Sequence, residues 1–298
     1  MADPDRTAWG GGLAAAGSEP VADIVRRALA EDLGPGDVTA DSVVPAGSTA
    51  TARLVQKAPG VLSGMGVAAE AFRQTGAGEL EPLAAEAEWR AEVPGDIARI
   101  SGPARALLAA ERTALNLLCH LSGVATLTAR YAAAVEGTRA RAIDTRKTTP
   151  GLRALEKRAV LDGGGLNHRL GLFDAILIKE NHAALGGGTA AAVRAAREAR
   201  PDLPVEIECR DIEEVRAALG EGADRLLLDN MPPAEMAAAV ALRDLAAAEG
   251  REVMLEASGG VTLDSIRAIA ESGVDFVSIG ALTHSAPVLD ISLLLDAG

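Results

Sequence analysis

Basic side chains gather in one part of this sequence, although the chain as a whole is acidic. Between Arg141 and Lys179 there are eight Lys or Arg residues against four Asp or Glu, whereas the whole chain has a formal net charge of −13. Guanidinium groups match the oxygens of carboxylates and phosphates, and an ammonium group supplies a point charge. The segment therefore indicates a site for an anionic small molecule. Part of it, Arg153, Lys157 and Arg158, follows Pro150 at helical spacing and is also typical of a solvated helix surface.

Short apolar runs that end in a polar residue position these basic groups. Helical segments follow the runs, and their landmarks lie 21 to 32 residues apart, at Lys147, Lys179, Glu208, Asp229, Ser258 and Gly280. Parallel strands that are buried on both faces read as continuous apolar runs, and right-handed crossovers place the helices outside. The pattern predicts an α/β fold, an incomplete TIM-like barrel of about six parallel strands whose carboxyl ends meet at one mouth.

Two carboxylates, Glu208 and Asp229, end consecutive runs and are expected side by side at this mouth. Facing a cationic pocket, they could hold Mg²⁺ together with phosphate oxygens of a substrate. They could equally form a structural ion network with Lys147 and Lys179. The residues by themselves leave both alternatives open.

Glycines mark two places where a backbone could approach a ligand. Ser258-Gly259-Gly260 follows a predicted strand and precedes a helix, an arrangement that presents free amides to phosphate. Gly163-Gly164-Gly165 precedes His168-Arg169 and could do the same, although a lone glycine triplet is more often a flexible loop.

The first part of the chain predicts a different architecture. Apolar spacing indicates a helix over 22–33, strand-like runs occupy 49–56, 86–93 and 97–100, and a long helix covers about 103–135. On that long helix Arg112, Asn116 and His120 share one face. The predicted organisation is a flexible arm over 1–20, an α+β domain over 21–123 with 284–298 as a candidate addition, and the barrel over 124–283.

Composition restricts the class of protein. Of the 298 residues, 48% are hydrophobic and 24% charged, which is typical of a globular protein, while the acidic balance and 2% aromatic residues disfavour nucleic-acid binding. Neither a secretory signal nor an apolar stretch of roughly 20 residues is present, so we expect no membrane partner. Cys119 and Cys209 form no CxxC pair. We therefore predict a cytoplasmic protein without a structural zinc site.

Long motifs in a fixed order resemble the quinolinate phosphoribosyltransferase family, the carboxylating nicotinate-nucleotide pyrophosphorylases. The resemblance runs from EDLGPGDVT at Glu31 to Leu294. The motifs that carry it are DTRKTTPGLRALEKRAV from Asp144, GGGLNHRLGLFDAILIKENH from Gly163, VEIEC from Val205, LLLDN from Leu226, EASGGV from Glu256 and SIGALTHSAPVLDISL from Ser278. The resemblance implies that quinolinate and phosphoribosyl pyrophosphate react, with Mg²⁺, to give nicotinate mononucleotide, pyrophosphate and CO₂ in de novo NAD synthesis.

The resemblance also implies roles for individual positions. Arg146, His168 and Arg169 look like a clamp for the two quinolinate carboxylates, with Lys179 nearby. Arg112 matches a position that reaches into the neighbouring subunit's site, which implies a homodimer. The other implied substrate-binding residues are Thr145, Lys147 at the phosphates, Glu208 and Asp229 at the ribose hydroxyls and Mg²⁺, and Ser258, Gly259, Gly260, Gly280 and Ala281 at the 5′-phosphate. Lys147, Lys179, Glu208 and Asp229 are the implied catalytic residues.

Two competing functions remain compatible with a barrel. A Schiff-base aldolase would use Lys179 as its amine, with a pKa lowered by burial. A related barrel protein of metal-transport operons, or a non-catalytic phosphoribosyl-binding protein, would keep the phosphate site without the dicarboxylate clamp. The complete set of Arg112, Arg146, His168 and Arg169 argues against the second alternative.

Overall fold

The computed structural model describes residues 20–296, which form two compact units. The barrel unit consists of residues 130–147 and 165–281, and the α+β unit of residues 20–129, 148–164 and 282–296. This division does not follow the predicted boundary between 123 and 124, because residues 124–129 and 148–164 belong to the α+β unit. Apart from Pro20, the predicted arm lies outside the described residues.

The α+β unit contains an antiparallel sheet with the strand order β12-β1-β5-β3. Residues from the two ends of the described chain meet in this sheet, since Ile291 to Asp296 of β12 pair with Gln56 to Thr51 of β1. Its elements are α1 (Val21–Leu33), α2 (Val38–Val43), β1 (Thr49–Gln56), β2 (Gly60–Val61), α3 (Met65–Thr75), β3 (Glu81–Pro82), β4 (Trp89–Arg90), β5 (Gly95–Pro103), α5 (Arg153–Asp162) and β12 (Ile291–Asp296). The helix α4 (Ala104–Ala134) supplies residues to both units.

The helix expected over 22–33 is confirmed as α1, but the strand expected over 86–93 is wrong except for β4. The chain leaves the extended conformation at Ala87, whose φ is 63°. Just before it, the Glu86 carboxylate accepts a hydrogen bond from the Met65 backbone N–H at 2.8 Å. Glu86 therefore serves the start of α3 instead of a strand ladder.

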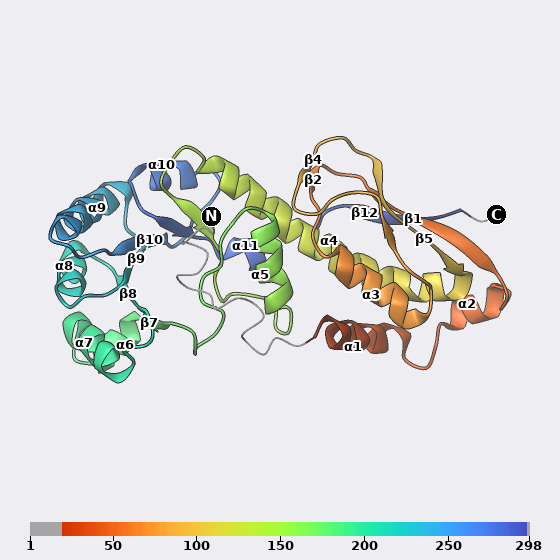
Figure 1. Ribbon diagram of the computed structural model, residues 1–298, viewed down its shortest axis with the longest axis horizontal. Helices are drawn as coiled ribbons and strands as arrows, with labels where there is room; N and C mark the ends of the chain where they lie inside the picture. The colour runs from red at the N-terminus through yellow and green to blue at the C-terminus, as the bar shows by residue number, and fades with distance from the viewer. Residues whose placement is uncertain (1–19, 297–298) are drawn as a thin grey trace. The chain divides into compact units, whose positions relative to one another are not determined.

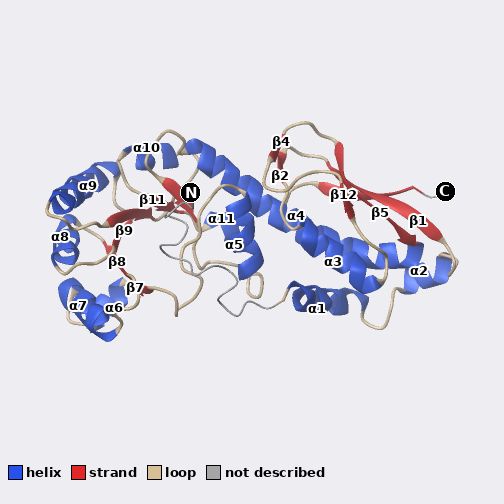
Figure 2. Cartoon of the chain, viewed as in Figure 1, coloured by secondary structure: helices blue, strands red, loops and turns tan. Residues whose placement is uncertain are grey.

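The barrel unit is built on one parallel sheet with the strand order β6-β11-β10-β9-β8-β7, and helices cover its outer face (Figures 1 and 2). The fold predicted for this region, an incomplete barrel of parallel strands, is confirmed. Its strands are β6 (Arg141–Ile143), β7 (Ile176–Ile178), β8 (Val205–Cys209), β9 (Arg225–Asp229), β10 (Met254–Ser258) and β11 (Phe276–Ser278). Its helices are α6 (Glu180–Leu185), α7 (Thr189–Ala199), α8 (Ile212–Gly220), α9 (Pro233–Ala248), α10 (Ile266–Glu271) and α11 (Ala281–His284).

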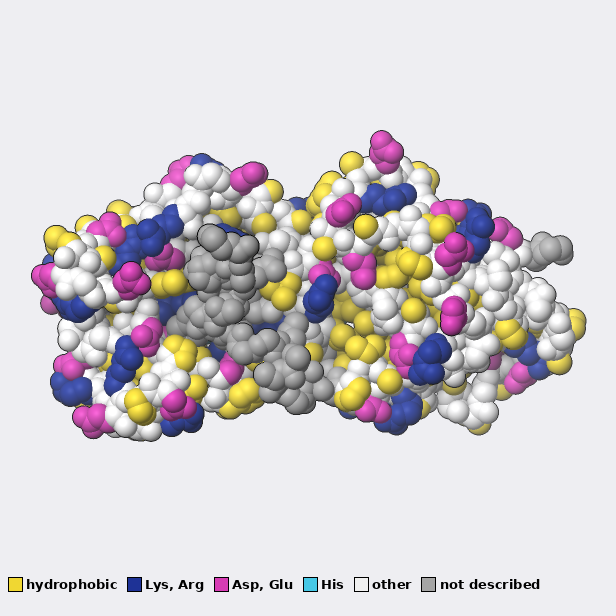
Figure 3. Space-filling view, viewed as in Figure 1, with side chains coloured by type: hydrophobic (Ala, Val, Ile, Leu, Met, Phe, Trp, Pro, Cys, Tyr) yellow, Lys and Arg dark blue, Asp and Glu magenta, His cyan; other side chains and the backbone are white. Residues whose placement is uncertain are grey.

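Alternation along these strands separates an apolar outer face from a charged inner one. In β8, Val205, Ile207 and Cys209 are completely buried, while Glu206 and Glu208 point to the opposite side. At the molecular surface, basic and acidic side chains are interspersed on the face drawn in Figure 3. Within residues 20–296 no helix has both the length and the apolar character that a membrane span requires.

Candidate active site

Three predicted site residues end neighbouring strands and define the barrel mouth: Glu208 on β8, Asp229 on β9 and Ser258 on β10. Asp229 and Ser258 are direct register partners. The loop after β9 is tied to β10, because the Asn230 backbone N–H donates to the Ser258 carbonyl at 2.8 Å. Two carboxylates and a hydroxyl thus share the carboxyl edge of the sheet, where barrel enzymes bind substrates.

Lys179, which follows β7, forms an ion pair with Glu208 at this mouth. Its side chain is 52% exposed. A Schiff-base lysine needs a neutral amine, which burial favours and a carboxylate partner opposes. The aldolase alternative therefore has no support in this environment, while the ion pair realises one contact of the predicted ion network.

Two guanidinium groups, Arg146 and Arg169, lie close enough to repel each other, and we call them the guanidinium pair. Burial, and next the charge of Arg146, lower the pKa of Arg169. Arg169 Nη1 donates to the Ala175 carbonyl at 2.9 Å, whereas its Nε is buried and donates to no atom of residues 20–296. A desolvated donor beside a like charge is costly. A bound anion would relieve both penalties.

The backbone of His168 and Arg169 is held firmly beside β6. Leu166 forms an isolated parallel bridge with Ile143 of that strand. The His168 N–H donates to Asp144 Oδ1 at 2.7 Å, and the Arg169 N–H donates to His168 Nδ1 at 2.7 Å. In the preceding loop, the Lys147 N–H donates to Thr145 Oγ1 at 3.0 Å.

The glycines after β10 have conformations that a side chain would disturb. Gly259 has φ of +104°, and a Cβ there would lie 2.1 Å from Asn230 Oδ1, while Gly260 has φ of +56°. Gly280 and Ala281 follow β11 and lead into α11. Of the predicted triplet, Gly163 serves packing, because a Cβ there would lie 2.4 Å from the Ala125 carbonyl oxygen of α4.

Arg112 is exposed on α4, in the α+β unit. On the same helix, His120 Nε2 lies 2.7 Å from Glu156 Oε1. The shared face of Arg112 and His120 therefore includes an internal contact of the α+β unit as well as an exposed cation.

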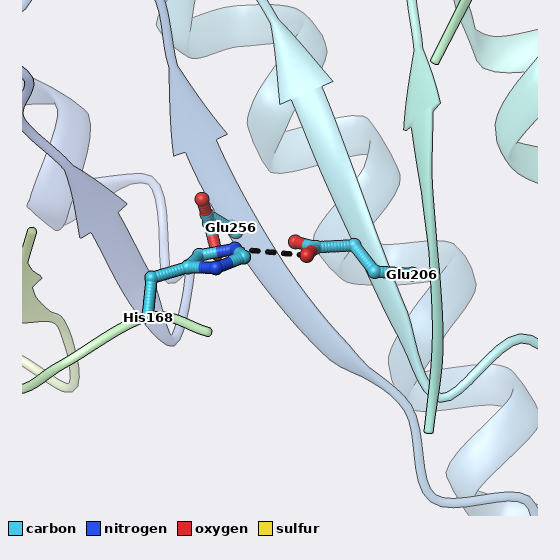
Figure 4. A group of neighbouring side chains, drawn as sticks. All are labelled: His168, Glu206 and Glu256. Atoms are coloured by element: carbon cyan, nitrogen blue, oxygen red, sulfur yellow. Dashed lines mark ion pairs between the residues drawn. The ribbon is translucent and has the colours of Figure 1, made fainter. Parts of the chain in front are cut away.

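Charged residues inside the barrel were missed by the sequence analysis. His168, Glu206 and Glu256 converge there (Figure 4), and with Arg225 they form what we call the buried cluster. His168 Nε2 lies 2.9 Å from Glu206 Oε2 and 3.5 Å from Glu256 Oε2, and Arg225 Nη1 donates to Glu256 Oε2 at 3.1 Å. The available signal was a charge on an inward position of each apolar strand run, before the mouth.

Burial and mutual interaction shift the proton affinities of the buried cluster. Burial, and then the charge of Glu206, raise the pKa of Glu256 to about 7. Burial opposes ionisation of Glu206 too, but His168 and Arg225 outweigh it and lower its pKa. Burial likewise disfavours a charged His168, while Glu256 and Glu206 raise its pKa. The Arg169 N–H opposes that effect, because it can donate only to an unprotonated Nδ1, and we place the ring proton on Nε2.

Comparison with known proteins agrees with this arrangement. The family described as quinolinate phosphoribosyl transferase matches with its N-terminal domain over residues 37–122 and its C-terminal domain over residues 124–294. The nicotinate-nucleotide pyrophosphorylase (carboxylating) of Mycobacterium leprae is 46% identical over 276 residues, covering 91% of this chain and 95% of the relative. A probable enzyme of the same name from Bacillus subtilis is 40% identical over 267 residues, covering 88% of this chain and 89% of the relative.

A solved structure has the same fold. The nicotinate-nucleotide pyrophosphorylase from Francisella tularensis superposes with a TM-score of 0.86 at 38% identity, covering 93% of this chain and 96% of that one. Agreement of both domains, in order and over nearly the whole described chain, leads to one conclusion. The chain belongs to the quinolinate phosphoribosyltransferase family.

Proposed function

We propose that this chain transfers the phosphoribosyl group of phosphoribosyl pyrophosphate to quinolinate, yielding nicotinate mononucleotide, pyrophosphate and CO₂ for NAD synthesis. Membership of the family supports the reaction. The single observation that carries it is the guanidinium pair, in which a buried, unsatisfied Arg169 Nε stands beside a second cation. Quinolinate carries two adjacent carboxylates, the anions that guanidinium forks bind best.

The proposed clamp uses Arg146 and Arg169 for the quinolinate carboxylates, with Lys179 nearby. Lys147 and Thr145 would face the phosphates of the donor. The 5′-phosphate would bind at Ser258 and at the amides after β10 and β11, those of Gly259, Gly260, Gly280 and Ala281. Left-handed glycines support this assignment, because they let backbone N–H groups approach an anion closely.

Glu208 and Asp229 fit a magnesium ion in the nature of their donors. Both are carboxylates, only partly buried, at the ends of adjacent strands. Mg²⁺ takes a few protein carboxylates together with phosphate oxygens and water. When bound, the ion would neutralise charge on the departing pyrophosphate. The same two carboxylates would orient the ribose hydroxyls, and Lys179 would hold Glu208 in place.

Positioning supplies most of the catalysis in this proposal. The bond between the anomeric carbon and pyrophosphate breaks, and the pyridine nitrogen attacks that carbon in line. Quinolinate then loses the carboxyl group next to the nitrogen as CO₂, the electron pair stays on the ring carbon, and a proton replaces the lost group. The pyridinium accepts those electrons, so no side chain has to act as a covalent nucleophile.

Assembly and location belong to the same proposal. Arg112 would complete the clamp of a second copy in a homodimer, and its exposure on α4 supports a role outside its own unit. The free thiols of Cys119 and Cys209 support a reducing compartment, for which we propose the cytoplasm.

A product assay tests the function. With phosphoribosyl pyrophosphate and Mg²⁺, we expect nicotinate mononucleotide from quinolinate and none from nicotinate. Arg146→Ala or Arg169→Ala should raise KM for quinolinate about a hundredfold, since a charged hydrogen bond contributes up to about 3 kcal/mol. Arg267→Ala, a surface arginine of α10 paired with Glu271, is the control. Unchanged quinolinate kinetics in both clamp variants would contradict the assignment.

A further inference from the structure

The interior of the barrel unit contains ionisable side chains where such barrels usually contain branched apolar ones. Glu206, Arg225 and Glu256 are at most 2% exposed, and His168 is 6% exposed. Burying a charge without organised partners costs several kcal/mol. A fold that keeps four ionisable groups together below its mouth must therefore hold them in a defined arrangement.

Partners inside the protein occupy both ring nitrogens of His168. Nε2 faces Glu206 Oε2 at 2.9 Å (Figure 4), and Nδ1 accepts the Arg169 backbone N–H at 2.7 Å. With the ring proton on Nε2, each nitrogen has a complementary neighbour. The ring thus contributes to the site by what it holds, whereas the guanidinium pair provides the donors for a substrate anion.

Arg225 completes the arrangement from the neighbouring strand β9. Its guanidinium donates to Glu256 and stacks over the Phe276 ring, with Cζ 4.2 Å from the ring centroid. The charges balance when Glu206 is ionised, Arg225 is positive and Glu256 carries a proton. The balanced buried cluster can then fix the orientation of His168 without leaving an isolated charge.

We propose that Glu206, Glu256 and Arg225 are positioning residues, which act through the His168 ring on the Arg169 backbone and so hold the Arg169 guanidinium where it meets a substrate carboxylate. His168 then belongs to the support of the clamp. This inference rests on the clamp proposed above. It assigns the strand charges that the sequence analysis missed to quinolinate affinity.

The same side chains have the donor types of a metal site, since His168, Glu206 and Glu256 each offer a ligand atom within 4.8 Å of the others. Arg225 argues against that alternative. Its Nη1 donates to the Glu256 oxygen that lies closest to His168. The guanidinium already supplies the cation that these carboxylates need.

Substitutions at Glu206 test the proposal. Glu206→Ala removes the acceptor at Nε2 and should raise KM for quinolinate about tenfold or more, while KM for phosphoribosyl pyrophosphate stays within about twofold. Glu206→Gln keeps an oxygen acceptor and should restore KM for quinolinate to within about threefold of the parent protein. Quinolinate should also protect the Gln variant, but not the Ala variant, against thermal unfolding.

Asp275→Asn is the matched control for a purely structural effect. Asp275 precedes β11 at the end of the sheet away from the mouth, is 7% exposed, and accepts from Arg243 Nη1 and the Leu255 N–H, both at 2.8 Å. This variant should lower Tm without changing KM for quinolinate. If Glu206→Ala behaves in the same way, the positioning role is wrong.

Two further outcomes separate the failures. If Arg169→Ala raises KM for quinolinate and Glu206→Ala does not, only the present inference is overturned. If neither variant changes it, the clamp itself fails. Stoichiometric metal in the purified protein that disappears in Glu206→Ala would replace the positioning role with a metal site.

Discussion

Each unit of this protein contains a completely buried glutamate beside a histidine, and the two pairs differ instructively. In the α+β unit, Glu156 Oε1 lies 2.7 Å from His120 Nε2, and Oε2 accepts the Thr149 N–H at 3.0 Å. In the barrel unit, Glu206 lies 2.9 Å from His168 Nε2 but shares its surroundings with Glu256 and Arg225.

The difference teaches how a buried carboxylate is made useful. Both oxygens of Glu156 have a donor, and the residue lies in the first turn of α5, where a negative charge is favourable. It can therefore connect α4, α5 and the preceding loop as a permanent anion. In the barrel, two carboxylates cannot both ionise easily, so one proton must stay between them. That region responds to pH, and it lies directly behind the guanidinium pair.

The largest effect on stability is expected at Glu156. Glu156→Ala leaves His120 and the Thr149 N–H without their acceptor, and we expect the free energy of unfolding to fall by about 3 kcal/mol. Urea denaturation measures it. Glu213→Ala, on an 87% exposed side chain of α8, is the control and should stay within about 0.5 kcal/mol. A loss below about 1 kcal/mol for Glu156→Ala would remove the structural half of the comparison.

A smaller, pH-dependent effect is expected at Glu256. Its pKa, raised to about 7, means that the folded protein holds a proton which the unfolded chain releases above its model value of 4.5. Stability contributed by this group therefore falls as pH rises through that window, by about 2 kcal/mol between pH 5.5 and pH 8. Urea denaturation across this range checks it. Glu256→Gln, which imitates the protonated carboxyl, should flatten the dependence; an equal slope in both proteins would locate the titration elsewhere.

The smallest effect concerns the ring beneath Arg225. Phe276→Leu removes the cation–π contact and should cost about 1 kcal/mol more than Phe72→Leu, which reports the loss of a buried ring in the α+β unit. Thermal and urea unfolding of the two variants give the difference. Equal costs would show that Arg225 gains nothing measurable from the aromatic face.

Much of the fold could be predicted because local patterns are strong. The apolar runs and their spacing predicted the parallel barrel, and the stripe of Ile24, Val25 and Leu29 predicted α1. The run at 86–93 failed, because its alternation carries no information about the tertiary demand on Glu86. Residues 148–164 were assigned to the wrong side of the division for a similar reason, since packing of Gly163 against α4 is not a local property.

Candidate site residues divide in the same way. Arg146, Arg169, Glu208 and Asp229 could be selected because strand ends converge in a parallel barrel, whatever the details of packing. The amino-acid sequence by itself determined the barrel, the charged mouth and the family. Only the tertiary structure decided that Glu206, Arg225 and Glu256 meet His168. Alternation specifies the face of a residue, but the height at which charges from separate strands and a loop coincide depends on register and closure of the sheet.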